Sequence, residues 1–163
     1  MAFDMFLKIE TVSGESIDEV HKGEIDLLSW TFGASQTGTA HVGGGAGAGR
    51  VQVQDLTFTK QVDRSSAILF SLCCKGTHLT KVQITVREAG GSPLEYLKVH
   101  LEKVLITGYS TGGTGSGNVD RLLETVTLNF ARVKLEYTPQ GEGGLGAASI
   151  IKGWDIGANK AWD

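Results

Sequence analysis

The chain has 163 residues, 40% of them hydrophobic and 20% charged, a composition that indicates one globular domain and excludes a disordered or fibrous protein. Fifteen basic residues against eighteen acidic ones give a net charge of −3, which argues against binding to nucleic acid or to an anionic membrane surface. Glycine is the outlier at 23 residues against two prolines, and its clustering at 33–49, 108–117 and 141–146 predicts long loops on an ordinary core.

The first residues, MAFDMFLKIE, lack the basic and then apolar regions of a secretory signal, so we expect no cleaved signal peptide. No stretch approaches the roughly 20 apolar residues of a membrane span, so we expect no membrane insertion. The two cysteines, Cys73 and Cys74, are adjacent and do not link distant segments. We therefore expect the chain to fold in a reducing cytoplasm.

Most of the chain alternates apolar and polar residues with a period of two, which is typical of half-buried β-strands. The cleanest alternation covers residues 3–9 and 82–86. Further strands are expected at residues 25–32, 51–59, 96–107, 122–137 and 149–156.

Four of these strands change phase partway, so that their apolar residues move from one parity to the other. The changes fall between Leu27 and Leu28, Val53 and Leu56, Leu101 and Val104, and Phe130 and Val133. A slip of one residue sends side chains to the opposite face, so each change predicts a bulge or a sharp bend, as in a closed barrel or a corner-turning sandwich. Burial of the second face against a neighbouring copy of the chain is another explanation, and both stay open.

One helix is predicted at Ser66–Lys75. A side-chain oxygen of Asp63 or Ser65 would accept a free backbone N–H at its beginning, and Gly76 would supply the left-handed residue after its end. Its apolar stripe consists of Ile68, Leu69, Leu72 and Cys73. The predicted fold is therefore mainly β: a single domain over residues 1–163, a β-barrel of two packed antiparallel sheets with one flanking helix and long glycine-rich loops.

Two glycine-rich motifs resemble nucleotide-binding sequences but lack the neighbouring residues and elements that nucleotide binding requires. Gly141–Gly146 spells G-x-G-x-x-G, but no helix follows it to hold a pyrophosphate, so we expect a hairpin loop there. The glycine tract at 43–49 continues into Arg50 and Val51 instead of the Gly-Lys-Ser/Thr of a P-loop.

The support for other candidate metal-binding or catalytic residues is equally weak. The histidines show no metal-ligand spacing and are expected at the surface; they are His21, His41, His78 and His100. The carboxylate pairs Glu15/Asp18 and Glu24/Asp26 are expected in solvated turns, and no G-x-S-x-G elbow is present. We therefore expect no enzymatic activity, no metal and no cofactor.

Several segments in a fixed order carry a resemblance to a known family. The start FLKIETVSGES is followed by Leu28-Ser-Trp-Thr-Phe-Gly33, the run Leu56-Thr-Phe-Thr-Lys-Gln-Val-Asp63 with Ser65-Ser66, the helix ending at Gly76, and the close Gly153-Trp-Asp-Ile-Gly-Ala-Asn159. Over essentially the whole chain these segments resemble the haemolysin-coregulated (Hcp) proteins, the tube subunits of type VI secretion. The most specific parts are the LTFTK-x-VD-x-SS run and the GWD ending.

The resemblance implies a β-barrel that assembles as a homohexameric ring around a lumen, with rings stacked into a tube. It implies partners in the spike, sheath and baseplate of the secretion machine, and effectors carried in the lumen. It also implies a protein that is made in the cytoplasm and is then secreted through the machine. The family has no catalytic residues.

The resemblance assigns ring stacking to the extended glycine-rich loop. Its candidate residues are Gly33, Ser35, Gly38, His41, Gly43, Gly44, Gly45, Gly47, Gly49 and Arg50. Arg50 and Lys60 are candidates for ion pairs between copies of the chain.

A competing interpretation is a monomeric β-barrel module that binds carbohydrate or another ligand. It depends on three tryptophans, Trp30, Trp154 and Trp162, whose rings would stack on sugar rings. An enzyme on the same scaffold is the third hypothesis.

Overall fold

A computed structural model gives the structure of the chain and describes residues 3–38, 41, 49–91, 93–115, 117, 121–144 and 146–163. In chain order the elements are β1 (Phe3–Ile9), β2 (Ile25–Asp26), β3 (Ser29–Thr31), β4 (Ala34–Ser35), β5 (Gln52–Val53), β6 (Leu56–Gln61), α1 (Ser66–Lys75), β7 (His78–Glu88), β8 (Glu95–Gly112), β9 (Leu123–Tyr137), the 3-10 turn η1 (Glu142–Gly144), β10 (Ile150–Asp155) and β11 (Lys160–Ala161). The predicted mainly-β fold with a helix at Ser66–Lys75 is confirmed.

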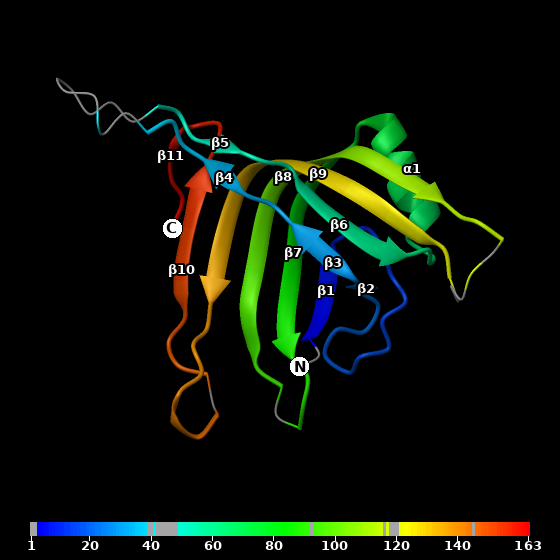
Figure 1. Cartoon of the computed structure of the whole chain (residues 1–163), viewed down its shortest axis with the longest axis horizontal. Helices are drawn as coiled ribbons and strands as arrows, with labels where there is room; N and C mark the ends of the chain where they lie inside the picture. Colours follow the sequence, from blue (N-terminus) through cyan, green and yellow to red (C-terminus); the bar gives the residue numbers. More distant parts are fainter. Residues whose placement is uncertain are drawn as a thin grey trace.

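The main sheet is antiparallel and runs in the order β11-β10-β9-β8-β7-β1-β2. β6 pairs with the first half of β9, from Leu123 to Leu128, whereas β10 pairs with its second half, from Arg132 to Tyr137. β3 pairs with β6, and these two strands cross in front of β7 and β8 in Figure 1. Among the described residues, hydrogen bonds do not join β11 to β2, so the barrel is a sheet folded over itself.

Three long strands bend along one line, and this bend accounts for two of the predicted phase changes. In β8, Lys103 lies in the left-handed region with φ of 54°. The register with β9 continues unchanged on both sides of it. Residues before and after the line are all buried in the core; they are Leu79 and Val82, Leu101 and Val104, and Phe130 and Val133. The change of parity in β8 and β9 is therefore a bend that β7 shares.

The other two phase changes are breaks between strands. The N–H of Leu27 donates to the carbonyl of Met5 on β1, and the N–H of Leu28 donates to that of Thr59 on β6, both at 2.9 Å. The chain thus crosses from one layer to the other between these two leucines. The predicted strand at 51–59 is likewise two strands, β5 and β6. The two-residue strands β4 and β11 were not expected, because so short a segment carries no alternation.

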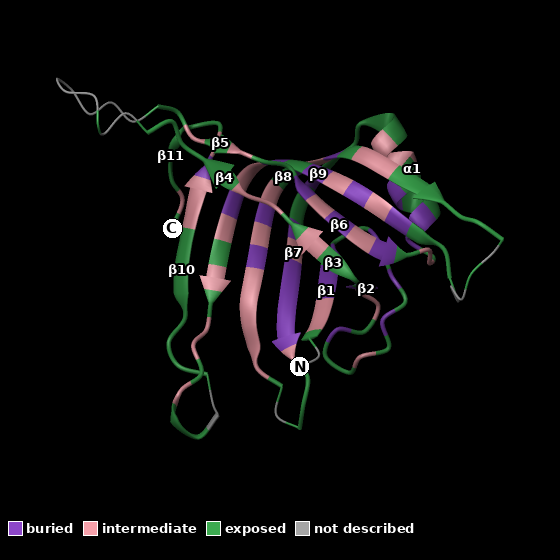
Figure 2. Ribbon diagram, viewed as in Figure 1, coloured by how far each residue is buried: buried purple, intermediate pink, exposed green. Residues whose placement is uncertain are grey.

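The hydrophobic core lies between the two layers, and buried residues alternate mainly with partly buried ones along β6 and the first half of β9 (Figure 2). The helix contributes Leu69, which is fully buried, and Leu72 and Cys73 pack against the core. Ile68 is 42% exposed, so its place on the predicted apolar stripe is wrong. Gly76 ends the helix in the left-handed conformation, as expected.

Candidate functional site

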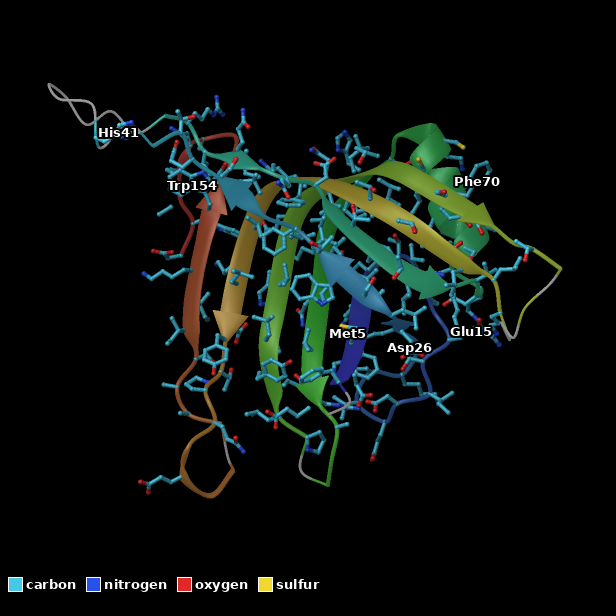
Figure 3. All side chains as sticks on the ribbon, in the orientation of Figure 1. Met5, Glu15, Asp26, His41, Phe70 and Trp154 are labelled. Atoms are coloured by element: carbon cyan, nitrogen blue, oxygen red, sulfur yellow. The ribbon has the colours of Figure 1, made fainter. Side chains whose placement is uncertain are left out.

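The loop assigned to ring stacking is carried by a short two-stranded arm. In this arm Ala34 lies opposite Val53 and Ser35 lies opposite Gln52. The backbone N–H of Gln54 donates to the carbonyl of Gly33 at 2.8 Å and closes its base. The arm extends away from the main sheet (Figure 1), and His41 lies beyond its far end (Figure 3).

Six of the ten candidate stacking residues are described, and the structure brings them together on this arm; they are Gly33, Ser35, Gly38, His41, Gly49 and Arg50. All of these except Gly33 are exposed. The other four, Gly43, Gly44, Gly45 and Gly47, lie outside the described residues. The Arg50 guanidinium donates to the carbonyl of Ile156 at 3.0 Å, which ties the arm to the chain just after β10.

The LTFTK-x-VD-x-SS run forms a buried ionic cluster at the start of α1. The Lys60 side chain is fully buried, and its ammonium bonds Asp63 Oδ1 at 2.9 Å and pairs with Glu124 of β9. Ser66 donates to Glu124 Oε1 at 2.7 Å. Tyr109 of β8 donates to the other Glu124 oxygen. The cluster joins β6, the helix, β9 and β8, so the expectation that Lys60 pairs with another copy of the chain is wrong.

The cluster shifts the acidity of two of its members. Burial favours a raised pKa for Asp63, but hydrogen bonds from Ser65 and Lys60 outweigh it and hold the pKa below its usual range. Burial, together with the bond to Glu124, raises the pKa of Tyr109 to about 12. Ser65 occupies the N-cap position of the helix without a side-chain cap bond, and its own N–H donates to Asp63 Oδ1 at 2.8 Å. Asp63 thus orders the turn before the helix.

The GWD ending fixes the edge of the sheet. A Cβ on Gly153 would lie 2.3 Å from the Trp162 carbonyl oxygen, so only glycine fits there. Asp155 accepts bonds from the Ala158 N–H and from Arg132 Nε, both at 2.9 Å. These two bonds, in that order of importance, lower the pKa of Asp155.

An apolar groove lies between the arm and the β9–β10 edge. We call it the arm groove; its volume is about 440 Å³, and its apolar lining includes Phe32, Val51, Val53, Val133, Leu135 and Trp154. Leu135 is 42% exposed. The indole N–H of Trp154 is buried, and among the described residues it has no hydrogen-bond acceptor. Composition and spacing gave no signal for this groove, because its lining comes from four separate segments.

At the opposite end of the sheet lies the segment between β1 and the end of β2, residues 10–26. We call it the acidic segment, because it carries six carboxylates and one lysine. Arg87 of β7 anchors it, donating to Asp18 at 2.7 and 3.0 Å and to Asp4 at 2.9 Å. The Arg87 bond is the main cause that lowers the pKa of Asp18 to about 2.

A histidine closes the same segment. His21 is buried at 6% exposure, stacks on Phe6 with ring centroids 4.3 Å apart, and bonds Glu24 at 2.8 Å and Glu95 at 2.6 Å. The expectation of a surface position for His21 is therefore wrong, as is that of a solvated Glu24. The sequence gave no indication of this clasp, because Glu95 lies 74 residues from His21.

The outer face of the main sheet is polar. Side chains from β1, β7, β8 and β9 line a depression of about 520 Å³ there. It contains the His100–Glu136 contact at 2.8 Å and the Lys134 ammonium 4.1 Å from the Trp162 ring centroid. The charged and polar side chains of this depression make the outer face polar, in contrast to the exposed hydrophobic side chains at the two ends of the sheet.

The structure does not favour the carbohydrate-binding interpretation. Each of the three tryptophans is half-buried: Trp30 stacks on Phe32, Trp154 lies in the arm groove, and Trp162 contacts Lys134. Gly141–Gly146 connects antiparallel β9 and β10, so the predicted hairpin loop is confirmed. Within the described residues, no group of three His, Cys, Asp or Glu side chains is placed to hold a metal, and no helix is long and apolar enough to cross a membrane.

The fold is a folded-over antiparallel sheet with one flanking helix, and large hydrophobic side chains lie exposed at both ends of the sheet. The sequence model described as "Type VI secretion system effector, Hcp" matches residues 6–137. The chain is 50% identical over 161 residues to protein hcp1 of Pseudomonas aeruginosa, covering 98% of both chains. The chain belongs to the Hcp family of type VI secretion proteins.

Solved structures agree with this assignment. The crystal structure of Hcp1 from Salmonella typhimurium superposes with a TM-score of 0.83 at 39% identity, covering 99% of this chain and all of the other. A structure of a type six secretion system protein superposes with a TM-score of 0.92 at 29% identity and the same coverage.

Removing the buried ammonium tests the cluster at the start of α1. We expect Lys60→Met to lower the free energy of unfolding by about 3–5 kcal/mol, because it leaves Glu124 buried without its charge partner. The double variant Lys60→Met/Glu124→Leu leaves no such charge and is expected to lose less. Urea unfolding at neutral pH measures both losses, and an equal loss in the two variants would contradict this account of the cluster.

The Asp18–Arg87 pair predicts a dependence of stability on pH. The pKa of Asp18 is about 2 in the folded chain against an ordinary value of 3.8. Its contribution is therefore complete above the ordinary value and is lost as the pH falls through about 2. We expect the stability advantage of the native chain over Asp18→Asn to shrink from pH 5 toward pH 2, as measured by thermal unfolding. Glu19→Gln, at an exposed carboxylate of the same segment, is the control; an advantage that stays constant with pH would contradict the prediction.

Proposed function

We propose that this chain is a ring-forming tube subunit of a type VI secretion machine. Six copies form a homohexameric ring, and rings stack into a tube that the contractile sheath expels with effectors in its lumen. The observation that carries the proposal is the 50% identity to protein hcp1 over 98% of the chain. A likeness over the full length covers both ends of the sheet and the arm, which are the parts that assembly needs.

The distribution of exposed apolar residues supports assembly. Large hydrophobic side chains lie exposed on β1 and between β1 and β3, at Phe3, Ile17, Val20 and Leu28, and on β9 and β10, at Leu135, Tyr137, Ile150 and Ile151. Others lie exposed on α1 and at or just before the start of β9, at Ile68, Phe70, Leu122 and Leu123. Exposed apolar surface of this extent marks contact with another protein. Burial in a ring would remove it from water on both sides of every subunit.

The lumen is assigned to the polar outer face of the main sheet. The other face of these strands is buried in the core, and the two ends of the sheet are apolar, so the outer face is the one suited to a water-filled channel. Its lining carries residues of both charge signs, among them Lys8, Glu10 and Lys81, beside the contact of His100 with Glu136. A lining of this kind binds cargo without one dominant charge.

The proposed partners are further copies of the chain, the spike, sheath and baseplate components, and effectors. The protein is made in the cytoplasm and reaches the outside of the cell through the machine. Its part in secretion is structural, and no step of bond-making chemistry is proposed.

The solution mass tests the proposal. Six chains of 17.3 kDa form a ring of about 104 kDa, which light scattering on a sizing column should detect as the main species. A mass of 17.3 kDa at every concentration would contradict the ring. Deletion of residues 42–48 provides the test of stacking: we expect the shortened chain to keep the ring and to form fewer tubes in negative-stain images. If the shortened chain forms as many tubes as the native chain, the loop does not take part in the stacking contact.

A further inference from the structure

The buried His21 side chain holds the acidic segment between two carboxylates. Its Nδ1 lies 2.8 Å from Glu24 in the same segment, and its Nε2 lies 2.6 Å from Glu95 at the start of β8. A neutral imidazole has one N–H group and one lone pair, whereas an ionised carboxylate only accepts hydrogen bonds. Both contacts are therefore satisfied only when His21 carries two ring protons and a positive charge. We call this arrangement the His21 clasp.

Stacking fixes the clasp to the sheet. The His21 ring lies on Phe6 of β1, with ring centroids 4.3 Å apart and ring planes inclined by 13°. Phe6 is itself buried, and the Arg87 guanidinium lies 5.0 Å from its ring centroid. The histidine thus belongs to a packed layer, in which its polar atoms need partners within the chain.

The other charged groups around the clasp keep their charge near neutral pH. Arg87 of β7 bonds Asp18 and Asp4, and this bond is the main cause that lowers the pKa of Asp18 to about 2. Lys98 of β8 lies 3.5 Å from Glu95 and is positively charged over the same range. Histidine is the side-chain type whose charge ordinarily changes between about pH 5 and 8, so His21 is the group here that responds to pH.

We propose that the His21 clasp is a pH-sensitive switch, which holds the acidic segment on the sheet while His21 is protonated and releases it when His21 loses a proton. A neutral His21 directs a lone pair at a carboxylate oxygen in a buried site, and a buried acceptor without a donor costs free energy. The clasp therefore contributes fully at mildly acidic pH, and its contribution is lost as the pH rises. The Asp18–Arg87 pair stays bonded and tethers the released segment.

The switch acts on an apolar part of the surface. The acidic segment, which lies between β1 and β2 in Figure 1, carries Ile17 and Val20, whose exposed fractions of 95% and 69% are the highest among the exposed large hydrophobic residues of the described chain. Beside the clasp, the Ser16 N–H donates to the Glu24 carbonyl at 3.0 Å and fixes the backbone that carries them. A released segment would have to be ordered again before it bound a partner, which weakens binding.

Amide hydrogen exchange of the native protein tests the switch. Mass spectrometry follows exchange in residues 10–26, and division by the unfolded-chain rate at each pH gives the protection of the segment. We expect the protection to fall about tenfold between pH 6 and pH 9, whereas that of the central strand β9 stays constant. Equal protection of the segment at the two pH values would overturn the switch.

An isosteric variant separates the switch from a general effect of pH. In Glu95→Gln the side-chain amide donates to the lone pair of a neutral His21, so we expect the segment to stay protected at pH 9. His21→Gln has no imidazole to titrate and should show the same low protection at both pH values. Glu136→Gln is the matched control, because it removes the carboxylate 2.8 Å from another histidine, His100, and should keep the native pH dependence. A loss of protection in Glu95→Gln as large as in the native chain would overturn the switch.

The switch goes beyond the proposed ring, because it concerns the order of one segment within one chain. Light scattering at each pH keeps the two proposals apart. A native chain that is monomeric at both pH values and shows the expected exchange would overturn the ring and support the switch. A ring with unchanged exchange at both pH values would overturn the switch and leave the proposed function intact. Circular dichroism at each pH confirms that the variants are folded.

Discussion

Burial of the Lys60 ammonium is the constraint on which the arrangement of helix and sheet depends. A charge removed from water needs an opposite charge and further acceptors at once. Asp63 and Glu124 supply the opposite charge, and the carbonyl of Gln61 accepts a further bond at 2.9 Å. Because these groups come from the turn before α1, from β9 and from β6 itself, the helix has one position in which all of them are satisfied. The LTFTK-x-VD-x-SS run therefore holds the helix against the sheet through the buried Lys60 and Ser66 within a single chain.

The shared bend of β7, β8 and β9 determines what the two ends of the sheet expose. Before the bend β9 pairs with β6, and after it β9 pairs with β10. The second layer thus covers only one half of the long strands. Leu135, beyond the bend, is left at the rim of the arm groove. The geometry that encloses the core in one half of the long strands leaves hydrophobic side chains such as Leu135 exposed in the other half.

Local patterns predicted the parts of the structure that depend on neighbours in sequence. The helix at Ser66–Lys75 and its left-handed end at Gly76 follow from spacing and propensity, and both are confirmed. The phase changes located the bend and the strand breaks, but the two explanations offered for them were not separable until the register of β8 and β9 was known. A change of parity shows that a strand has apolar residues on both of its faces. It does not show which part of the protein covers either face.

Local sequence patterns did not predict the contacts between residues that lie far apart in the chain. The pairing of Lys60 with Glu124 crosses 64 positions and that of His21 with Glu95 crosses 74, and nothing in either local pattern links the two partners. Lys60 was expected to pair with another copy on the basis of the family resemblance, whereas its side chain is fully buried within the chain. The arm groove was not predictable from local patterns, because its lining comes from four segments that only the fold brings together.

The proposal that remains to be tested most directly is that the chain forms a ring in which the two ends of the main sheet meet between neighbouring copies. An electron cryo-microscopy reconstruction of the purified ring, at a resolution that shows side chains, tests it most directly. In the proposed ring we expect six-fold symmetry, with the exposed hydrophobic residues at the two ends of the main sheet buried between neighbouring copies. Two-fold contacts between like ends, or an arm groove open to solvent in the assembled ring, would contradict it.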